Sequence, residues 1–287
     1  MAHKVDNAVI LAAGLSSRFA PLSYEKPKGL LKVRGEVLIE RQIRQLQEAE
    51  VKDIFVVTGY KAEAFSYLQD LSGVKLLHNP DYAVRNNHSS IWVARDVLAN
   101  TYICSVDNYF AKNPYEAVVS DPYYACLYAQ GPTKEWCVWT DEVGYINRVE
   151  IGGADAYYMM GHVFWDQTFS RDFLHILEPI HDLPQTRDAL WERIYLDHLD
   201  RLKLKVRPYG DDEIFEFDSL EELRAFDPTY LDHSGSEILD RISREAGAKE
   251  RDINNIVPDS DGFTFRLNGR DRTYRYDYQN QNWRTLS

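Results

Sequence analysis

The sequence is poor in cysteine and lacks any long apolar run. Its 287 residues contain three cysteines, an odd number with no Cys-x-x-Cys pair, so neither a disulfide framework nor a zinc site is indicated. No apolar run approaches the roughly 20 residues that a membrane-spanning helix needs. The amino-terminal residues carry charges before a short apolar run and do not read as a signal peptide. We therefore expect a cytoplasmic protein without membrane insertion.

Positive charge is also scarce. The formal net charge is −12, which argues against a general nucleic-acid surface or an anionic-membrane surface. Hydrophobic residues make up 44% and charged residues 27% of the chain, values that are ordinary for a soluble globular enzyme. The length allows one large domain or two small ones.

The most informative segment lies near the amino terminus. Residues 9–11 form an apolar run typical of a buried parallel strand, and residues 12–14 are small. Small residues let the backbone approach a ligand closely and offer N–H groups to phosphate, and the two serines that follow can cap a helix. Arg18 and Lys28 add the charge that a triphosphate requires. The segment therefore favours nucleotide binding.

Residues 11–18 (Leu-Ala-Ala-Gly-Leu-Ser-Ser-Arg) and 27–31 (Pro-Lys-Gly-Leu-Leu) resemble the signature of the sugar-phosphate and choline-phosphate nucleotidyltransferases. Residues 105–109, 135–136, 164–166 and 215–219 narrow this resemblance to the bacterial choline-phosphate cytidylyltransferases, over about residues 6–228. The resemblance implies transfer of CMP from CTP to phosphocholine, giving CDP-choline and pyrophosphate. It also implies Mg²⁺ as the cofactor, with CTP and phosphocholine as the partners.

The resemblance assigns residues to the nucleotide. Arg18 and Lys28 are the expected catalytic cations, flanking the phosphates. The other residues expected to contact the nucleotide come from the loop, the second strand and the segment after residue 80: Leu11, Ala12, Ala13, Gly14, Ser16, Ser17, Gly59, Tyr60, Tyr82, Asn87 and Ser89. Capping is the alternative role for the asparagines.

Three carboxylates are candidates for the metal. Asp107 follows an apolar strand, and ligands of open α/β sheets bind beyond the carboxyl ends of strands. Glu216 and Asp218 lie two residues apart in a strand-like run, so we expect both side chains on one face. Carboxylate oxygens suit octahedral Mg²⁺. By resemblance, Asp107 and Asp218 are the expected ligands, with Glu216 close to them.

An aromatic set in the second half of the chain suggests the acceptor site. A trimethylammonium group donates no hydrogen bond, so its recognition relies on cation–π contacts and a nearby carboxylate. Asp188 precedes Trp191 by three residues and would lie beside it on a helix. Large rings also dominate cores, which is the competing interpretation for each tryptophan. The expected acceptor-binding residues are Asn86, Trp136, Trp165, Asp188 and Trp191.

The alternation of strand-like and helical runs predicts an α/β fold. We expect a Rossmann-like three-layer sandwich with a mostly parallel central sheet. Strand-like runs at 8–12, 54–58, 74–77 and 102–106 alternate with helical patterns at about 36–49, 61–70 and 88–98. A β-rich insertion for the acceptor follows at 123–129, 136–141, 145–151 and 158–165, then helical patterns at 166–178 and 186–200, and strand-like runs at 204–207 and 215–217.

The composition changes near residue 228. We therefore expect a nucleotidyltransferase domain over residues 1–228 and a small α+β appendage over 229–287. Residues 234–246 form an amphipathic helix with a serine cap, and two alternating runs around an Asn-Gly turn predict a β-hairpin. This tail resembles the opening of a choline-kinase-type N-terminal lobe but stops before any catalytic lobe. A packing or homodimerisation role is the simpler interpretation.

Other activities remain open. 2-Aminoethylphosphonate is the nearest rival acceptor, because its primary amine needs carboxylate or carbonyl partners, for which Asp166, Asp188 and Glu192 are candidates. A sugar-1-phosphate acceptor is disfavoured by the tryptophan-rich second half. A regulatory protein that retains the fold without catalysis is a third alternative, which the presence of Arg18, Lys28 and the acidic set opposes.

Overall fold

The computed structural model describes residues 2–286 and contains two compact units. One comprises residues 2–14 and 38–216, and the other comprises residues 15–37 and 217–286. This grouping differs from the predicted boundary at residue 228. The difference arises because the C-terminal helix and hairpin pack with the segment that carries Arg18 and Lys28 instead of standing alone.

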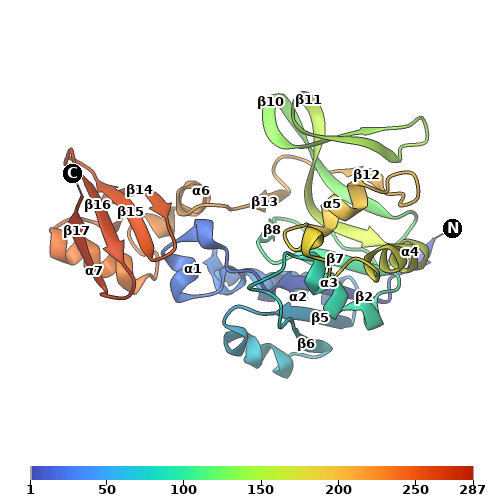
Figure 1. The fold of residues 1–287 in the computed structure, drawn as a ribbon, viewed down its shortest axis with the longest axis horizontal. Coiled ribbons are helices and arrows are strands. Elements are labelled where there is room, and N and C mark those ends of the chain that lie inside the picture. Colours follow the sequence, from blue (N-terminus) through green and yellow to red (C-terminus); the bar gives the residue numbers. More distant parts are fainter. Residues whose placement is uncertain (1, 287) are drawn as a thin grey trace. The chain divides into compact units, whose positions relative to one another are not determined.

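A seven-stranded sheet forms the centre of the first unit (Figure 1). Its strand order is β12 (Lys205–Pro208), β10 (Tyr123–Thr140), β11 (Ile146–Trp165), β7 (Thr101–Ser105), β2 (Asn7–Ala12), β5 (Asp53–Thr58) and β6 (Val74–His78). Strands β7, β2, β5 and β6 are mutually parallel, whereas β11 runs antiparallel to β7 and β10. The predicted α/β class with a mostly parallel sheet is confirmed. Strand β2 is largely apolar because both of its faces are buried.

Helices of the first unit cover this sheet. The α-helices are α2 (Leu38–Glu48), α3 (His88–Val93), α4 (Gln167–Leu177) and α5 (Trp191–Leu196), and the 3₁₀ helices are η3 (Ala62–Asp70), η4 (Arg95–Val97) and η5 (Pro184–Thr186). The predicted helices at 36–49 and 166–178 are confirmed, the second with Asp166 capping its first turn. The prediction of an α-helix over 61–70 is wrong in type, and that over 88–98 divides into α3 and η4.

The helix predicted over residues 186–200 is shorter than expected. Its α-helical part begins at Trp191, because the preceding backbone is bound by the asparagines of another loop. The Asn86 amide donates to the carbonyl of Asp188 (3.1 Å), and the Trp191 N–H donates to the Asn87 side chain (2.7 Å). The prediction that Asp188 lies on a helix is therefore wrong.

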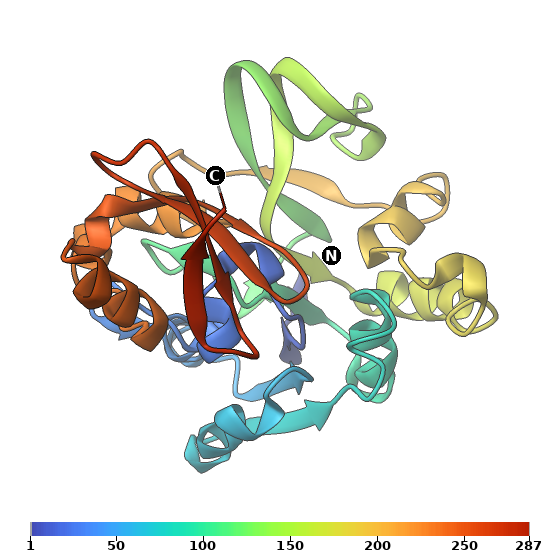
Figure 2. The ribbon, with the colours of Figure 1, turned by 60° about the vertical axis from the view of Figure 1, so that its left-hand side comes forward.

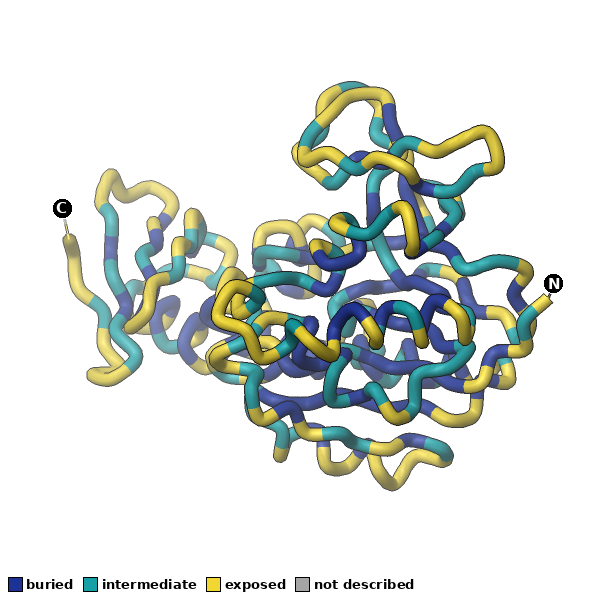
Figure 3. Tube along the Cα trace, turned by 45° about the vertical axis from the view of Figure 1, so that its right-hand side comes forward, coloured by how far each residue is buried: buried dark blue, intermediate teal, exposed yellow. Residues whose placement is uncertain are grey.

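Strands β10 and β11 form a long ribbon whose distal loop is largely exposed (Figures 1 and 3). The four β-rich runs expected between residues 123 and 165 are thus two strands, irregular in register where bulges interrupt the pairing. Two short antiparallel pairs complete the unit: β1 (His3–Lys4) with β9 (Val118–Val119), and β8 (Asn108–Phe110) with β13 (Ile214–Glu216). No helix within residues 2–286 is long and apolar enough to cross a membrane.

The second unit combines a segment of the amino-terminal half with the C-terminal residues. Its first part contains η1 (Ser17–Phe19), α1 (Leu22–Glu25), η2 (Lys28–Leu30), β3 (Lys32–Val33) and β4 (Glu36–Val37). Its second part contains α6 (Leu220–Phe226), η6 (Pro228–Leu231), α7 (Glu237–Ala246), η7 (Glu250–Asp252), and the strands β14 (Ile253–Pro258), β15 (Gly262–Leu267), β16 (Thr273–Asp277) and β17 (Asn282–Thr285).

The C-terminal strands form one antiparallel sheet in sequence order, with α7 preceding it (Figure 2). The predicted helix and hairpin are both confirmed. Ser236 caps α7 by accepting from the N–H of Leu239 (3.1 Å), and the left-handed Gly269 (φ +75°) lies in the turn between β15 and β16. The flanking strands β14 and β17 extend this hairpin to four strands.

Candidate functional site

The first part of the site lies at the carboxyl ends of β2 and β5. The Tyr60 N–H donates to the carbonyl of Ala13 (3.0 Å). A Cβ on Gly59 would meet the Tyr82 side chain at 2.5 Å and the Ala13 oxygen at 2.9 Å, so only glycine fits this close approach. The structure therefore brings together predicted nucleotide-binding residues from three segments. A Cβ added to Gly14 would meet nothing within 4 Å, so the loop faces open space there.

The two serines of the loop do not cap a helix. Ser16 adopts a left-handed conformation (φ 49°), and its side chain makes no capping hydrogen bond to η1. The capping prediction is wrong for this residue. The following 3₁₀ turn is closed by backbone bonds alone, from the N–H of Phe19 to Ser16 and from that of Ala20 to Ser17.

The side chains of Arg18 and Lys28 differ strongly in solvent exposure, but both interact with the carboxylate of Asp218. The Arg18 side chain is 74% exposed and its guanidinium lies 2.7 Å from the Asp218 carboxylate. The Lys28 side chain is 4% exposed, with its Nζ 4.0 Å from the other Asp218 oxygen and 5.3 Å from the centre of the Phe19 ring. This unit therefore places both predicted catalytic cations around a single anion.

Asp218 does not lie on a strand with Glu216, and the expectation that they share one strand face is wrong. Strand β13 ends at Glu216. Asp218 precedes the N-cap Ser219, and its N–H donates to Glu222 in the first turn of α6 (2.6 Å). The capping box of α6 therefore turns the chain immediately after the strand.

Asp107 lies one residue before the position in β8 that pairs with Glu216. Asp107 directly precedes β8, and its neighbour Asn108 is the strand partner of Glu216, to whose carboxylate it donates (3.2 Å). Asp107 also accepts from the Ser105 hydroxyl (2.5 Å). Paired carboxylate oxygens suit Mg²⁺ in their donor chemistry. No three His, Cys, Asp or Glu side chains among residues 2–286 are grouped closely enough to hold a metal ion.

Helix α2 holds the loop that carries Asp107. The buried amide of Gln42 donates to the carbonyls of Ser105 and Asn108 (both 2.9 Å), on either side of the aspartate. Arg41 donates to the carbonyls of Phe110 and Ala111. Sequence reasoning missed both residues, although a glutamine on the apolar face of a predicted helix is a detectable signal, because buried amides need partners.

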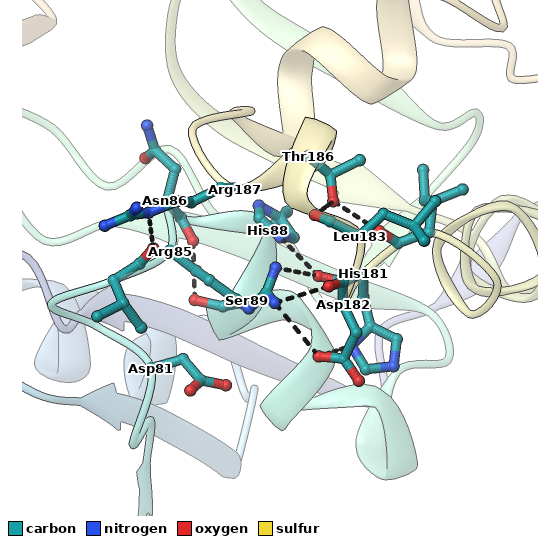
Figure 4. Close-up of polar contacts among 12 residues, drawn as sticks. Asp81, Arg85, Asn86, His88, Ser89, His181, Asp182, Leu183, Thr186 and Arg187 are labelled. Atoms are coloured by element: carbon teal, nitrogen blue, oxygen red, sulfur yellow. Dashed lines mark hydrogen bonds and ion pairs between the residues drawn. The ribbon is translucent and has the colours of Figure 1, made fainter.

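The predicted ligands Asn86, Asn87 and Ser89 all make hydrogen bonds within the protein, and Figure 4 shows the one between Ser89 and Asn86. Besides the bonds that shorten α5, the Asn87 amide donates to the Glu192 carboxylate (3.1 Å). The Ser89 side chain is buried, donates to the carbonyl of Asn86 (2.8 Å) and accepts from Asn79 (2.8 Å). Direct nucleotide binding by Ser89 is therefore not what its surroundings favour, because its hydroxyl is already committed within the fold.

Arg85 strengthens the same connection. Its guanidinium donates to the carbonyls of His181 (2.7 Å) and Asp182 (2.9 Å), and Arg187 donates back to the carbonyl of Val84 (2.9 Å; Figure 4). Two loops about 100 residues apart in sequence are thus bonded in both directions. These bonds fix the residues just before α5, and with them the first turn of that helix.

The carboxylate of Glu192, which accepts the hydrogen bond from Asn87, lies in the first turn of α5 next to Trp191. Burial raises the pKa of Glu192 to about 7, against the opposing effect of the hydrogen bond from Asn87. Burial also raises the pKa of Tyr124 well above its usual range, and the charges of Glu192 and Glu216 add to that shift. The predicted acceptor half of the first unit therefore contains two carboxylates beside Tyr124. The sequence offers Glu192 only as a candidate partner for an amine acceptor.

The tryptophans divide into core and surface. Trp165 is fully buried and packs against both Phe169 and Phe173, so its surroundings favour the competing interpretation of a core residue over contact with the acceptor. Trp191 is 2% exposed and stacks against Tyr124. Trp136 is partly exposed on β10 and is the tryptophan of the predicted set that a ligand can reach. Asp188 is exposed outside any helix.

The comparisons with known proteins point to one group of enzymes. A model of the MobA-like NTP transferase domain matches residues 8–121. The chain is 30% identical over 217 residues to a choline-phosphate cytidylyltransferase of Streptococcus pneumoniae, covering 76% of this chain and 95% of that protein. It is 34% identical over 238 residues to a 2-aminoethylphosphonate cytidylyltransferase of Lancefieldella rimae, covering 78% of this chain and 93% of that protein.

Solved structures agree with these similarities. The structure of a CTP:phosphocholine cytidylyltransferase from Streptococcus pneumoniae superposes with a TM-score of 0.74 at 30% identity, covering 78% of this chain and 97% of that one. An inositol-1-phosphate CTP transferase from T. maritima superposes with a TM-score of 0.62 at 18% identity, covering 80% and 95%, and shares the fold.

Proposed function

The chain belongs to the nucleotidyltransferase family, as a member similar to its cytidylyltransferases, and on this premise we propose that its acceptor is phosphocholine. The reaction is the transfer of CMP from CTP, which releases pyrophosphate and forms CDP-choline. The cytidylyltransferase activity follows from the relatives, and the acceptor is the part that needs an argument from this chain.

The observation that carries the acceptor is a carboxylate of raised pKa that interacts electrostatically with Tyr124. Glu192 follows Trp191, interacts electrostatically with Tyr124 and is bonded to the uncharged amide of Asn87. A raised pKa means that ionised Glu192 lacks compensating positive charge, which a cationic ligand would supply. The partly exposed Trp136 offers an accessible aromatic face. An aromatic face together with a carboxylate suits a quaternary ammonium group, because that group carries charge without hydrogen-bond donors.

The proposed chemistry needs positioning and charge neutralisation. A phosphate oxygen of phosphocholine attacks the α-phosphorus of CTP in line, forming the new P–O bond while the bond to pyrophosphate breaks. A phosphate is already nucleophilic at neutral pH, so no general base is required. Lys28 stabilises charge on the α-phosphate and Arg18 holds the departing β- and γ-phosphates. Backbone N–H groups of residues 12–14 contact the triphosphate.

Mg²⁺ is the proposed cofactor, and Asp107 and Glu216 are the residues that fit it best, with Asp218 as the further predicted ligand. When bound, the ion neutralises phosphate charge. Gln42 and Arg41 keep the Asp107 loop in place through four backbone carbonyls.

2-Aminoethylphosphonate is the second candidate acceptor. Its primary ammonium group needs hydrogen-bond acceptors, and ionised Glu192 offers a carboxylate oxygen for it. The exposed Asp188 lies close in sequence and adds a second carboxylate. The two acceptors therefore differ in how much they depend on aromatic contact and how much on charge.

Pyrophosphate release with CTP and Mg²⁺ tests the proposal, with phosphocholine, 2-aminoethylphosphonate and a sugar-1-phosphate offered separately. A kcat/KM at least about tenfold higher for phosphocholine supports it, a difference of about 1.4 kcal/mol. Preference for the phosphonate replaces the acceptor and keeps the enzyme class. Absence of turnover with every acceptor would refute the activity and favour a nucleotide-binding regulator.

Two variants separate the acceptors further. Trp136→Leu removes an aromatic face that phosphocholine uses in this proposal, while Trp136→Phe keeps one. We expect the leucine variant to raise KM for phosphocholine about two- to fivefold, because an exposed cation–π contact contributes about 0.5–1 kcal/mol. Equal KM values in the two variants would remove Trp136 from the acceptor site.

A further inference from the structure

The segment that carries both catalytic cations is bound by the C-terminal residues within the second unit. We call residues 15–37 the cation segment and residues 229–286 the appendage. At its far end the Arg34 N–H donates to Asp227 (2.7 Å), just before the appendage. The Tyr230 hydroxyl of the appendage donates to the carbonyl of Lys32 (3.0 Å). Two hydrogen bonds from the C-terminal part of the chain therefore hold the end of the cation segment.

Glu25 makes the connection nearest to Lys28. It is the last residue of α1, and its carboxylate accepts from the N–H of Ile238 in the first turn of α7 (3.0 Å). Ser236, the N-cap of α7, also bonds to this carboxylate. A carboxylate at a helix N-terminus satisfies N–H groups that have no partner within the helix and interacts favourably with the helix dipole. Glu25 thus supplies a cap to a helix more than 200 residues away.

Burial raises the pKa of Glu25 despite these hydrogen bonds. Burying the ionised carboxylate therefore costs desolvation free energy, and the hydrogen bonds from the N-terminus of α7 offset part of that cost. A surface glutamate with no role in the junction would carry no such cost. This makes the Glu25 contact a built feature of the junction.

The junction around Glu25 combines individual contacts with a cavity. The ring of Tyr24 stacks on Tyr278 at 3.7 Å between centres and 4° between planes. Beside it lies a cavity of ≈ 280 Å³, lined on one side by α1 and Lys26 and on the other by Thr229 and His233. Because the cavity leaves the end of α1 without full packing on this side, the position of Glu25 depends there on the individual contacts.

We propose that Glu25 is a positioning residue, through which the appendage sets the place of Lys28. This rests on the roles proposed above for Lys28 and Arg18. Two residues separate Glu25 from Lys28, and each residue adds at most about 3.8 Å between Cα atoms, so a shift at the end of α1 is passed on to η2. The Asp218 carboxylate interacts with the charged groups of Arg18 and Lys28. Glu25 holds the backbone that lies between these two residues in sequence.

The test uses full-length variants. Glu25→Ala removes the cap, Glu25→Gln keeps an oxygen in the same place, and Arg275→Gln breaks an exposed ion pair with Asp259 inside the appendage as the control. We expect Glu25→Ala to lower kcat about 10- to 100-fold, the effect of a displacement near 1 Å, with KM for the acceptor unchanged. Glu25→Gln should recover most of the loss, and the control should behave as wild type.

Hydrogen exchange of residues 22–31 gives a readout independent of activity. Exchange there should be at least about tenfold faster in Glu25→Ala than in Glu25→Gln or the control. If the alanine variant does not fold, Glu25→Asp, which keeps the charge and loses reach, takes its place with the same expectations. Wild-type kcat together with unchanged exchange would overturn the proposal, as would a lower melting temperature with kcat intact.

The design separates this inference from the proposed function. If wild type turns over no acceptor, the proposed function fails, and the exchange comparison alone decides whether Glu25 fixes the cation segment. If wild type is active and the exchange of residues 22–31 is the same in all variants, the positioning role fails and the proposed function stands.

Discussion

Glu192 provides a prediction about stability that does not depend on the substrate. Its folded-state pKa of about 7 lies above the ordinary value of 4.5, because burial disfavours the ionised form. A carboxyl group whose pKa is raised in the folded state stabilises the fold at pH values below its ordinary pKa. That contribution is lost as the pH rises through the folded-state pKa of about 7. Replacing Glu192 with glutamine removes the charge and keeps an oxygen for the Asn87 amide.

The size of the effect follows from the shift. A difference of about 2.5 in pKa corresponds to about 3 kcal/mol at pH 8, and the partial exposure of Glu192 reduces this to about 2 kcal/mol. We therefore expect Glu192→Gln to increase the free energy of unfolding by about 2 kcal/mol at pH 8 and by less than about 1 kcal/mol at pH 5.

Urea unfolding of wild type and Glu192→Gln at the two pH values measures this directly. Glu135→Gln, which neutralises an exposed carboxylate, is the matched control and should change the stability little at either pH. An equal gain for Glu192→Gln at pH 5 and pH 8 would refute the assignment of a raised pKa to this residue.

The same variant reports on the acceptor. In wild type, KM for a cationic acceptor should rise as the pH falls below 7, because protonated Glu192 no longer attracts it. Phosphocholine itself titrates near pH 6, at its phosphate. Glu192→Gln shares that titration and lacks the carboxylate, so a pH profile identical to wild type would exclude Glu192 from the acceptor site.

The remaining predictions concern catalysis and the core. Lys28→Ala and Asp107→Ala should each lower kcat by about 10²-fold or more without unfolding the chain, because each removes charge stabilisation at the phosphates, as measured by pyrophosphate release and circular dichroism. EDTA should abolish turnover and excess Mg²⁺ should restore it, as followed in the same assay. Trp165→Ala should destabilise the fold by about 3–5 kcal/mol in urea unfolding, because it leaves a cavity against two phenylalanines.

Each of these predictions has an outcome that would contradict it. Near-wild-type kcat in either alanine variant would remove that residue from the mechanism. Full activity in EDTA would remove the metal. A Trp165→Ala variant of unchanged stability and raised acceptor KM would restore the ring to the acceptor site.

Much of the architecture was predictable from local patterns. Strands β2, β5, β6 and β7 follow from apolar runs, because a parallel strand buried on both faces needs apolar residues throughout. The C-terminal hairpin follows from its Asn-Gly turn, and the family follows from the residues around Arg18 and Lys28. Each of these signals is contained in a short stretch of sequence.

The tertiary structure decided the roles of single side chains. Sequence spacing placed Asp218 on a strand with Glu216, whereas the α6 cap turns the chain and Asp218 pairs with Arg18, 200 positions away. For Asn87, the resemblance predicts a nucleotide contact, and the structure adds a hydrogen bond to Glu192, 105 positions away, that no local pattern indicates.

Sequence by itself determined the fold class, the central sheet and the family of this protein, because strand patterns and loop motifs are local. Only the tertiary structure decided that Trp165 is core, that burial raises the pKa of Glu192 to about 7, and that Glu25 caps α7. The physical reason is that burial, electrostatic environment and hydrogen-bond partners depend on which distant segments fold against each other, and no local pattern encodes those contacts.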